Sequence, residues 1–370
     1  MILSNIQLKN FRSHKSLNLN FSSGLNYIIG GNGQGKTSVI EAIVYLCTAK
    51  GHTVKTDGEA VCFNEDRFEI AGIFRGETEN RANVIYTKSQ NKKSYFKNEK
   101  KITRAADIIG KFPVVLLSPD DHAITQGTPG ERRRFIDSVI SQASETYFRN
   151  LLDYNKTLLQ RSSLLNQIKD HRSKNMLSEL DAWSSILVRT GSYIIKQRKR
   201  FINSFNEYVS QSYALIMEQA ETPDVFYAHL GNYAGEDIEK EFERQIARRK
   251  EEEIARGTNL VGPQRDDFIF SLNGNNLKTY GSQGQHKTFQ VALRFAEFFY
   301  LKEITGTEPI FLLDDVFGEL DTHRAQKISQ YLTNVEQAFI TVTDLSNFSF
   351  LKRNETDNVI LLKAGEVTYA

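Results

Sequence analysis

The eight residues from Gly30 to Thr37 constrain this chain more than any other stretch. They read Gly30-Gly31-Asn32-Gly33-Gln34-Gly35-Lys36-Thr37. This order fits the pattern G-x-x-x-x-G-K-[ST]. An apolar run, Leu25 to Ile29, precedes it, and a run with helical texture, Ser38 to Leu46, follows it. The pattern therefore stands between a predicted strand and a predicted helix, which is the context of a phosphate-binding loop.

A loop of this kind binds phosphate through its backbone. The glycines let the chain curl so that successive N–H groups point inward, and the positive end of the following helix adds to the attraction. Lys36 is expected to neutralise the β- and γ-phosphates, and the Thr37 hydroxyl to hold Mg²⁺. The alternative is a glycine-rich turn that binds nothing, which would require strand, loop, Lys-Thr pair and helix to coincide by chance.

A second motif carries acids at the end of an apolar strand. Ile310 to Leu313 is apolar and is followed by Asp314 and Asp315. In a parallel sheet such a strand is buried on both faces, and ligands bind at its carboxyl end. We expect Asp314 to complete the Mg²⁺ site opposite Thr37, and Asp315 to orient or deprotonate the attacking water. Alone, the stretch could equally be a strand that ends in solvated acids.

A third motif precedes the acidic strand by some thirty residues. It contains Ser282, Gln283, Gly284 and Gln285, and a helical run follows it. It resembles the signature motif of ABC-type ATPases, in which a serine, a glycine and a helix start reach the γ-phosphate held by the P-loop of a second protomer. Two incomplete half-sites then imply a head-to-tail homodimer. Gln283 departs from the glycine usual in transporters, and by itself the stretch could be a helix cap.

The segment after the acidic strand resembles the D-loop of the same ATPases, which contacts the partner subunit. It reads Gly318-Glu319-Leu320-Asp321.

Composition narrows the class of protein. The 370 residues are 40% hydrophobic and 25% charged, as in an ordinary soluble globular protein, and the net charge of +2 gives no argument for nucleic-acid binding. The N-terminus alternates like a strand rather than resembling a signal peptide, and no apolar run approaches the ~20 residues of a membrane span. Cys47 and Cys62 have no paired metal-ligand spacing. We expect a cytoplasmic protein.

The texture of the chain changes twice. Residues 1–117 are predicted as an N-terminal ATPase lobe of strands around one helix, with the P-loop and an antiparallel β layer. Residues 118–257 are predicted as an inserted helical lobe, since apolar residues recur there at helical spacing. Residues 258–370 alternate strand and helix and should complete a mostly parallel sheet. The predicted fold is α/β: a P-loop ABC-type ATPase head with an antiparallel β layer and a helical insertion.

Two segments are locally basic. Between Val84 and Arg104 seven basic residues stand against one acid, and between Glu131 and Arg200 fourteen stand against seven. Such an excess can neutralise phosphates without reading sequence. A solvated face is the alternative for either patch.

The order of motifs along nearly the whole chain resembles the RecF family of bacterial recombinational repair ATPases. The residues that carry the resemblance are Asn10-Phe11-Arg12-Ser13-His14, the P-loop, Leu117-Ser118-Pro119-Asp120-Asp121, Arg132-Arg133-Arg134-Phe135-Ile136-Asp137, Gly262-Pro263-Gln264-Arg265-Asp266-Asp267, Ser282-Gln283-Gly284-Gln285 and Leu313-Asp314-Asp315-Val316. The RecF family is grouped with the chromosome-structuring ATPases but lacks their long coiled-coil arm.

The resemblance implies more than the residues themselves do. It implies ATP as the nucleotide, Arg12 in its site, ATP-dependent dimerisation and slow hydrolysis stimulated by DNA. It also implies binding to DNA at gaps or junctions and cooperation with RecR and RecO in loading the recombinase RecA. Gln264 stands where the family more often has histidine, so no catalytic role is carried to it. Asp315 stands where transporters have glutamate, and its shorter side chain suits slow turnover.

Two other functions remain as alternatives. The first is the ATPase subunit of a membrane transporter, which the modified signature and the helical insertion disfavour. The second is a nuclease related to the overcoming-lysogenization-defect proteins, which would need a further acidic metal-binding domain after the ATPase part.

Overall fold

The computed structural model describes residues 1–217, 221–229, 237–319, 321–332, 335–344, 357–363 and 366–369. Contacts divide the chain into two compact units. Unit 1 comprises residues 1–121, 211–220 and 287–370, and unit 2 comprises residues 122–210 and 221–286. The boundaries predicted at residues 117 and 257 remain a prediction.

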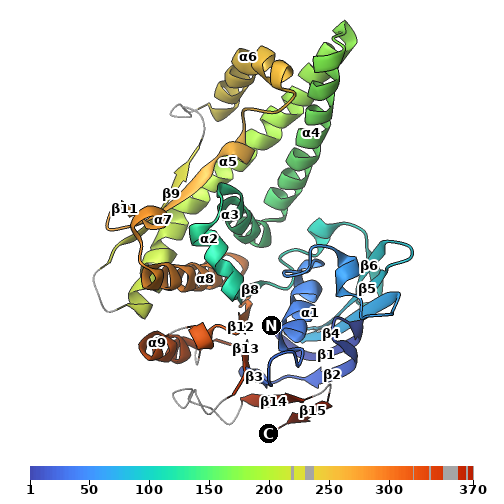
Figure 1. Cartoon of the computed structure of the whole chain (residues 1–370), viewed down its shortest axis with the longest axis vertical. Helices are drawn as coiled ribbons and strands as arrows, with labels where there is room; N and C mark the ends of the chain where they lie inside the picture. The colour runs from blue at the N-terminus through green and yellow to red at the C-terminus, as the bar shows by residue number, and fades with distance from the viewer. Residues whose placement is uncertain are drawn as a thin grey trace. The chain divides into compact units, whose positions relative to one another are not determined.

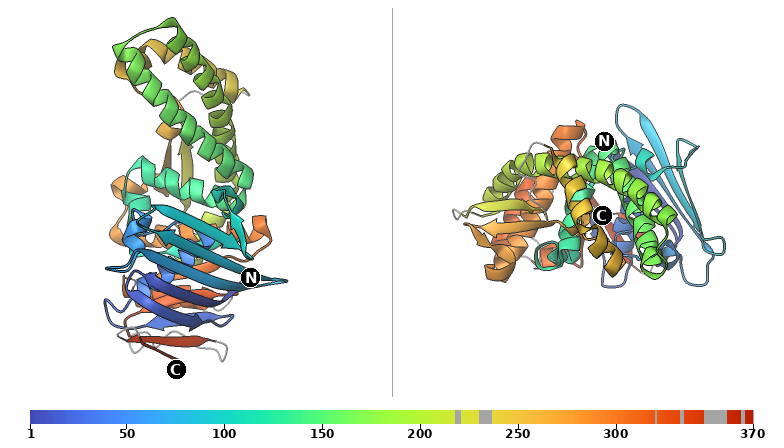
Figure 2. Two further views of the ribbon diagram at one scale, coloured as in Figure 1. Left: turned by 90° about the vertical axis from the view of Figure 1, so that its right-hand side faces the viewer. Right: turned by 90° about the horizontal axis from the view of Figure 1, so that it is seen from above.

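An antiparallel sheet forms one layer of unit 1. Its strand order is β2-β1-β4-β5-β6-β7, and Figure 2 shows its strands lying side by side in blue and cyan. The strands are β1 (Ile2–Phe11), β2 (His14–Asn20), β4 (Arg67–Arg75), β5 (Glu79–Thr87), β6 (Lys92–Lys97) and β7 (Lys100–Ile102). Residues alternate between buried and more exposed along β4 and β5, so one face of the sheet meets the core.

The second sheet of unit 1 carries the P-loop. Its order is β15-β14-β3-β13-β12-β8, parallel from β14 to β8 and antiparallel between β14 and β15. The strands are β3 (Leu25–Ile29), β8 (Val114–Leu117), β12 (Ile310–Asp314), β13 (Ala338–Val342), β14 (Asn358–Lys363) and β15 (Glu366–Tyr369). Every residue of β3, β12 and β13 is buried, as expected for central strands of a parallel sheet.

Helix α1 (Lys36–Thr48) contacts strands of both sheets and is drawn in blue in Figure 1. It is buried over most of its length, and its Ile40, Ile43 and Leu46 share one hydrophobic core with residues of β1, β4 and β12. The first residues of this helix belong to the P-loop, so the core that fixes α1 also fixes the end of the loop. Unit 1 also contains most of α8 (Gln283–Thr305), all of α9 (Thr322–Leu332), and the short 3₁₀ segments η1 (Asp57–Ala60), η2 (Ala105–Asp107), η3 (Pro119–Asp121) and η5 (Phe317–Glu319).

Unit 2 is mainly helical. Its helices are α2 (His122–Gln126), α3 (Pro129–Ala143), α4 (Glu145–Asp170), α5 (Lys174–Ile216, as far as Ser210), α6 (Ile238–Arg256) and α7 (Leu277–Tyr280). The turn between α4 and α5 is short, because α4 ends at Asp170 and α5 begins at Lys174. Leu164, Leu165 and Ile168 of α4 pack with Leu180 of α5 and Ile254 of α6.

Unit 2 also holds a small sheet that the alternation of strand and helix did not predict. Strand β10 (Asp267–Leu272) pairs antiparallel with β9 (Pro223–Ala228) and β11 (Asn275–Asn276), and η4 (Pro263–Arg265) precedes it. The stretch around residue 268 was expected to continue the parallel sheet, and it belongs to this separate sheet instead. Within the described ranges, no helix combines the length and the apolar character needed to cross a membrane.

Candidate nucleotide-binding site

The P-loop follows β3 and leads into α1, as predicted. Gly35 has φ +89°, a left-handed conformation that favours glycine, and a Cβ there would lie 2.4 Å from His14 Nε2. A Cβ on Gly30 would lie 2.5 Å from the carbonyl oxygen of Leu362 in β14. These positions therefore require glycine for steric reasons, independently of any ligand.

Lys36 is held inside the loop. Its Nζ donates to the carbonyl oxygens of Gly30 at 2.8 Å and Gly31 at 3.2 Å, and the residue is 8% exposed. The backbone N–H of Gly30 donates to Val342 in β13, and that of Gln34 donates to Gly31. The ammonium group is thus held over the curled backbone, in the place where a phosphate would meet it.

The acidic strand lies beside the P-loop helix. Asp314, at the end of β12, accepts a hydrogen bond from Thr37 Oγ1 at 3.3 Å and one from Thr341 Oγ1 at 2.7 Å. Burial raises the pKa of Asp314, while these two hydroxyl donors act in the opposite direction. Hydroxyl and carboxylate oxygens are ligands that Mg²⁺ accepts, so Thr37 and Asp314 fit the predicted metal site.

Asp315 adopts an uncommon backbone conformation. Its φ is +53°, and its N–H donates to Thr341 Oγ1 at 2.8 Å. Thr341, in β13, thus contacts both acids, and no motif in the sequence pointed to it. A non-glycine residue with positive φ is strained, and such residues concentrate at functional sites.

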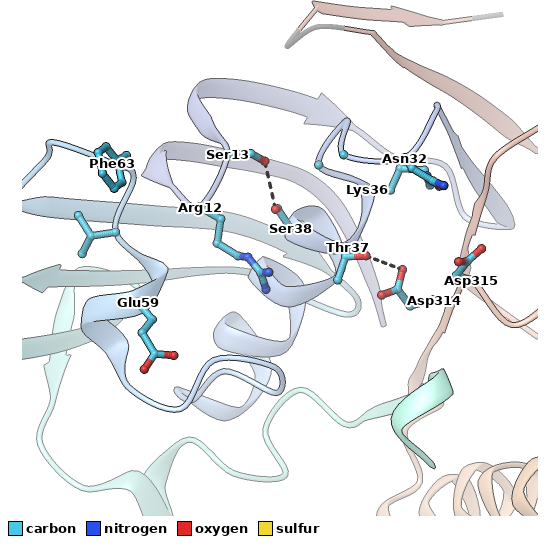
Figure 3. Close-up of a pocket in the computed structure, with 13 residues that line it drawn as sticks. Arg12, Ser13, Asn32, Lys36, Thr37, Ser38, Glu59, Phe63, Asp314 and Asp315 are labelled. Atoms are coloured by element: carbon cyan, nitrogen blue, oxygen red, sulfur yellow. Dashed lines mark hydrogen bonds between the residues drawn. The ribbon is translucent and has the colours of Figure 1, made fainter. Parts of the chain in front are cut away.

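One cavity of about 510 Å³ joins these groups. Its lining residues are Arg12, Ser13, Asn32, Gly33, Gly35, Lys36, Thr37, Ser38, Glu59, Val61, Phe63, Asp314 and Asp315. The volume is within the usual range of about 300–1,000 Å³ for small-molecule sites. In Figure 3 the acids and Thr37 lie at one end, Phe63 and Glu59 at the other, and Arg12 between them.

Phe63 was not singled out from the sequence. Its side chain lines the cavity although the residue is 88% exposed. An aromatic ring that is open to solvent at the end of this cavity offers a face on which a nucleobase could stack. Glu59 belongs to η1, and Val61 and Phe63 follow it before β4, in a stretch where no periodic pattern marks them.

The signature-like stretch caps α8. Ser282 Oγ accepts from the N–H of Gln285 at 3.2 Å, and Gln285 Oε1 accepts from the N–H of Ser282 at 2.8 Å. This reciprocal pair is a capping box. Gln283 and Gly284 form the first turn of α8, and Gln285 Nε2 also donates to Glu221 at 2.7 Å. Ser282 is therefore the N-cap of α8, and its hydroxyl lies at the start of this long helix.

The D-loop-like stretch leads from η5 into α9. Gly318 and Glu319 belong to η5, while Leu320 lies outside the described residues. Asp321 accepts from the N–H of Arg324 at 3.0 Å at the start of α9, and this hydrogen bond is the main reason that the pKa of Asp321 is lowered.

Three other motifs form buried ion pairs within one unit each. In unit 2, Arg132 binds both carboxylate oxygens of Asp267 at 2.8 and 2.9 Å, and Arg198 binds both of Asp137 at 2.9 and 2.8 Å. In unit 1, Arg294 binds Asp121 at 2.9 and 2.6 Å. These contacts give the motifs a structural role.

Burial and ion pairing reduce the number of basic side chains that the two segments expose. In the segment from residue 131 to 200, Arg132, Arg161 and Arg198 are buried, and their partners are acids. In the other segment, Lys93 pairs with Asp57 at 2.8 Å. Exposed basic side chains remain on the edge of the antiparallel sheet, namely Lys88, Lys92, Lys100, Lys101 and Arg104.

Comparison with known proteins gives consistent matches. The family model described as RecF/RecN/SMC N terminal domain matches residues 2–366. The DNA replication and repair protein RecF of Chloroherpeton thalassium is 37% identical over 368 residues, which cover 97% of this chain and 100% of that protein. RecF of Salinibacter ruber is 38% identical and covers 93% of this chain, with 85% of its own length matched.

Solved structures agree with the sequence matches. The recombination mediator protein RecF with ATP, of the RecFOR pathway, matches with a TM-score of 0.90 at 31% identity, over 100% of this chain and 97% of that one. An SMC head bound to the C-winged helix domain of ScpA matches at 0.57 and 15% identity, which shows shared fold alone. The predicted fold class, a P-loop ATPase head with an antiparallel β layer and a helical insertion, is confirmed.

Proposed function

The chain belongs to the RecF family of DNA replication and repair proteins, and from that premise we propose that it is an ATP-gated DNA-binding protein of recombinational repair. Binding of ATP pairs two copies head to tail on DNA, and slow hydrolysis releases them. The protein then acts in the cytoplasm with RecR and RecO at gaps or junctions, where it aids the loading of RecA.

The observation that carries this proposal is the meeting of Thr37 with Asp314 in the P-loop cavity. Thr37 comes from the start of α1 and Asp314 from the end of β12, and their oxygens lie 3.3 Å apart. Mg²⁺ bound to these oxygens would neutralise phosphate charge beside Lys36. The RecF structure with ATP, at 31% identity, supports ATP as the nucleotide.

The roles within the site follow from the chemistry of each side chain. Lys36 exchanges its carbonyl partners for phosphate oxygens, Arg12 adds a second positive charge, and Asp315 orients the attacking water. The ring of Phe63 stacks on the base. Ser282 at the start of α8 offers a second anion site, to be completed by the nucleotide of a second copy.

For DNA, the exposed lysines of the β5–β7 edge are the favoured contacts. They lie on or beside neighbouring strands of one sheet, and exposed lysines neutralise phosphates without reading sequence. The proposal predicts that DNA affinity falls steeply with salt. The segment from residue 131 to 200 contributes less than its composition indicated, because Arg132, Arg161 and Arg198 are buried.

The test combines sedimentation with DNA-mobility shift in ATP, in ADP and without nucleotide. We expect a dimer and a shifted DNA band with ATP alone. Lys36→Ala should bind no ATP and remain monomeric, whereas Asp315→Asn should retain ATP and accumulate as the dimer. The exposed Lys50 is the matched control, since Lys50→Ala should behave as wild type. A monomer with equal DNA affinity in all three conditions would refute the proposal.

A further inference from the structure

Arg12 is held in an uncommon conformation at the middle of the cavity. Its φ is +50°, and its N–H donates to the carbonyl oxygen of Ala60 at 2.8 Å. Its side chain lines the cavity, and Nη1 donates to Thr53 Oγ1 at 2.5 Å. The guanidinium group is planar and suited to phosphate oxygens. Its position in the cavity therefore determines whether it can reach the phosphates of a bound ligand.

Thr53 belongs to the irregular segment between α1 and η1, and a buried acid of α1 holds this segment. Glu41 Oε1 accepts from the N–H groups of His52 at 2.9 Å and Thr53 at 3.1 Å, and Oε2 accepts from Thr53 at 3.2 Å. Glu41 is 2% exposed. Hydrogen bonds from backbone N–H groups to a carboxylate are charge-assisted and stronger than neutral ones.

The acid has close neighbours in the same segment. A Cβ on Gly51 would lie 2.6 Å from Glu41 Oε1, so the backbone approaches the carboxylate closely there. A buried carboxylate is costly unless it is hydrogen-bonded, and an apolar residue would suit the core around α1 better. The acid therefore has a use that the packing of α1 does not explain.

Glu41 is also well placed on its helix. It follows Thr37 by four residues, one turn along α1. The same rigid helix thus carries Thr37 at the metal site and the acid that holds the segment of Thr53. A connected path of hydrogen bonds leads from α1 through Glu41 and Thr53 to the guanidinium of Arg12.

We propose that Glu41 is a positioning residue for the nucleotide site: through the backbone of residues 52 and 53 and the hydroxyl of Thr53, it fixes Arg12 where the phosphates of the nucleotide bind. The inference rests on the proposed ATP site and adds residues that no motif of that site contains. It assigns to the segment between α1 and η1 the function of holding a phosphate ligand.

The test starts at Thr53, which is exposed and can be changed without disturbing the core. Thr53→Val removes the hydroxyl and keeps the shape, and Thr53→Ser keeps the hydroxyl. We expect Thr53→Val to weaken ATP binding by about three- to tenfold, as for the loss of one typical hydrogen bond, and Thr53→Ser to bind within about twofold of wild type. Thr56→Val, an exposed change in the same segment, is the matched control.

A double-mutant cycle distinguishes positioning from a general structural role. In an Arg12→Ala background, Thr53→Val and Glu41→Gln should cause no further loss of ATP affinity, because the group they position is gone. Calorimetry with ATP and the thermal midpoint of each variant are measured together. If Glu41→Gln lowers the thermal midpoint, its ATP affinity is set aside, and the comparison of Thr53→Val with Thr53→Ser decides whether the positioning role holds.

Two results would overturn the inference: ATP affinity of Thr53→Val equal to that of wild type, or an equal loss with and without Arg12. Lys36→Ala separates this failure from failure of the ATP site. If Lys36→Ala loses ATP while Thr53→Val does not, only the positioning role falls. If Lys36→Ala binds ATP normally, the proposed site itself is wrong.

Discussion

Thr37 Oγ1 lies 3.3 Å from Asp314 Oδ1, although 277 positions separate the two residues in the chain. The contact exists because β3 and β12 both end at the same edge of the parallel sheet, each paired with β13. Their carboxyl ends place a hydroxyl and a carboxylate together, which is the arrangement that open parallel sheets use for ligands.

The first prediction concerns Mg²⁺. Thr37→Val and Asp314→Asn should each reduce the gain in ATP affinity that Mg²⁺ provides by about tenfold or more, which corresponds to about 1.4 kcal/mol. Thr37→Ser keeps the hydroxyl and should retain the gain. Thr341→Val removes the hydroxyl that donates to Asp314 and should weaken Mg²⁺ binding by about 10–100-fold. Each protein is titrated with ATP in the presence of Mg²⁺ and in the presence of EDTA, and the ratio of the two affinities is the gain that Mg²⁺ provides. An unchanged ratio in Thr37→Val would contradict the assignment.

The second prediction concerns the far end of the cavity. Phe63→Ala should weaken ATP binding by the cost of one lost stacking contact, about 1–3 kcal/mol per base. Tripolyphosphate, which has no base, should bind Phe63→Ala as it binds wild type, and Phe63→Trp should restore ATP binding. Competition titrations with both ligands give the comparison. A matching loss for tripolyphosphate would show that the ring supports the loop rather than the base.

The parts of this site that the sequence predicted are those encoded by adjacent residues. The P-loop needs glycines in order, a lysine and a threonine, and the acidic strand needs four apolar residues before two acids. Both patterns are local, and β3, α1 and β12 form where they were expected. The apolar run of the acidic strand also indicated burial on both faces, which the structure bears out for β12.

Other parts depend on contacts between distant segments and left no pattern. Thr341 is one threonine in an apolar strand, and only the pairing of β13 with β12 brings it to Asp314. Phe63 and Thr53 belong to irregular segments whose path is set by Glu41 and the neighbouring strands. Strands β9, β14 and β15 were not predicted, and a short apolar run near the C-terminus does not reveal that β14 pairs with β3.

The third prediction concerns pH. Burial lowers the pKa of His14, whose Nε2 lies 3.1 Å from the carbonyl oxygen of Gly35. The folded protein resists protonation of this ring. The contribution of the neutral ring to the free energy of unfolding is therefore fully present above the unfolded pKa of about 6.5, and it is lost as pH falls below that value. Chemical denaturation from pH 7.5 to 5.5 should show a smaller loss for His14→Gln than for wild type. Parallel curves for the two proteins would contradict this.

The fourth prediction concerns the buried ion pair of unit 2. Arg161 Nη2 lies 2.6 Å from Glu253 Oε2, and their side chains are 1% and 0% exposed. Arg161→Met would leave the carboxylate buried without its partner and should cost about 3–5 kcal/mol of unfolding free energy. Replacing both residues with Met should cost less than the single change. Urea denaturation measures all three proteins.

The exposed pair between Arg172 and Glu251 is the control for that experiment. Its distance is 2.7 Å, but its side chains are 49% and 69% exposed. Solvent screens a pair of this kind, so Arg172→Met should leave the unfolding free energy close to that of wild type. Equal losses for Arg161→Met and Arg172→Met would mean that burial does not set the cost.

The fifth prediction separates the two roles of Ser282. Its hydroxyl caps α8 by accepting from the N–H of Gln285, and we propose that it also meets the nucleotide of a second copy. Ser282→Ala should bind ATP, fail to pair, and lose about 1 kcal/mol of stability with the cap. Ser282→Asp keeps a capping oxygen but places negative charge where the partner's phosphate would arrive, so it should be stable and yet monomeric with ATP. Sedimentation with ATP, beside thermal unfolding, measures both properties. An Asp variant that dimerises as wild type does would mean that Ser282 is a cap only, because a carboxylate facing a phosphate cannot leave pairing unchanged.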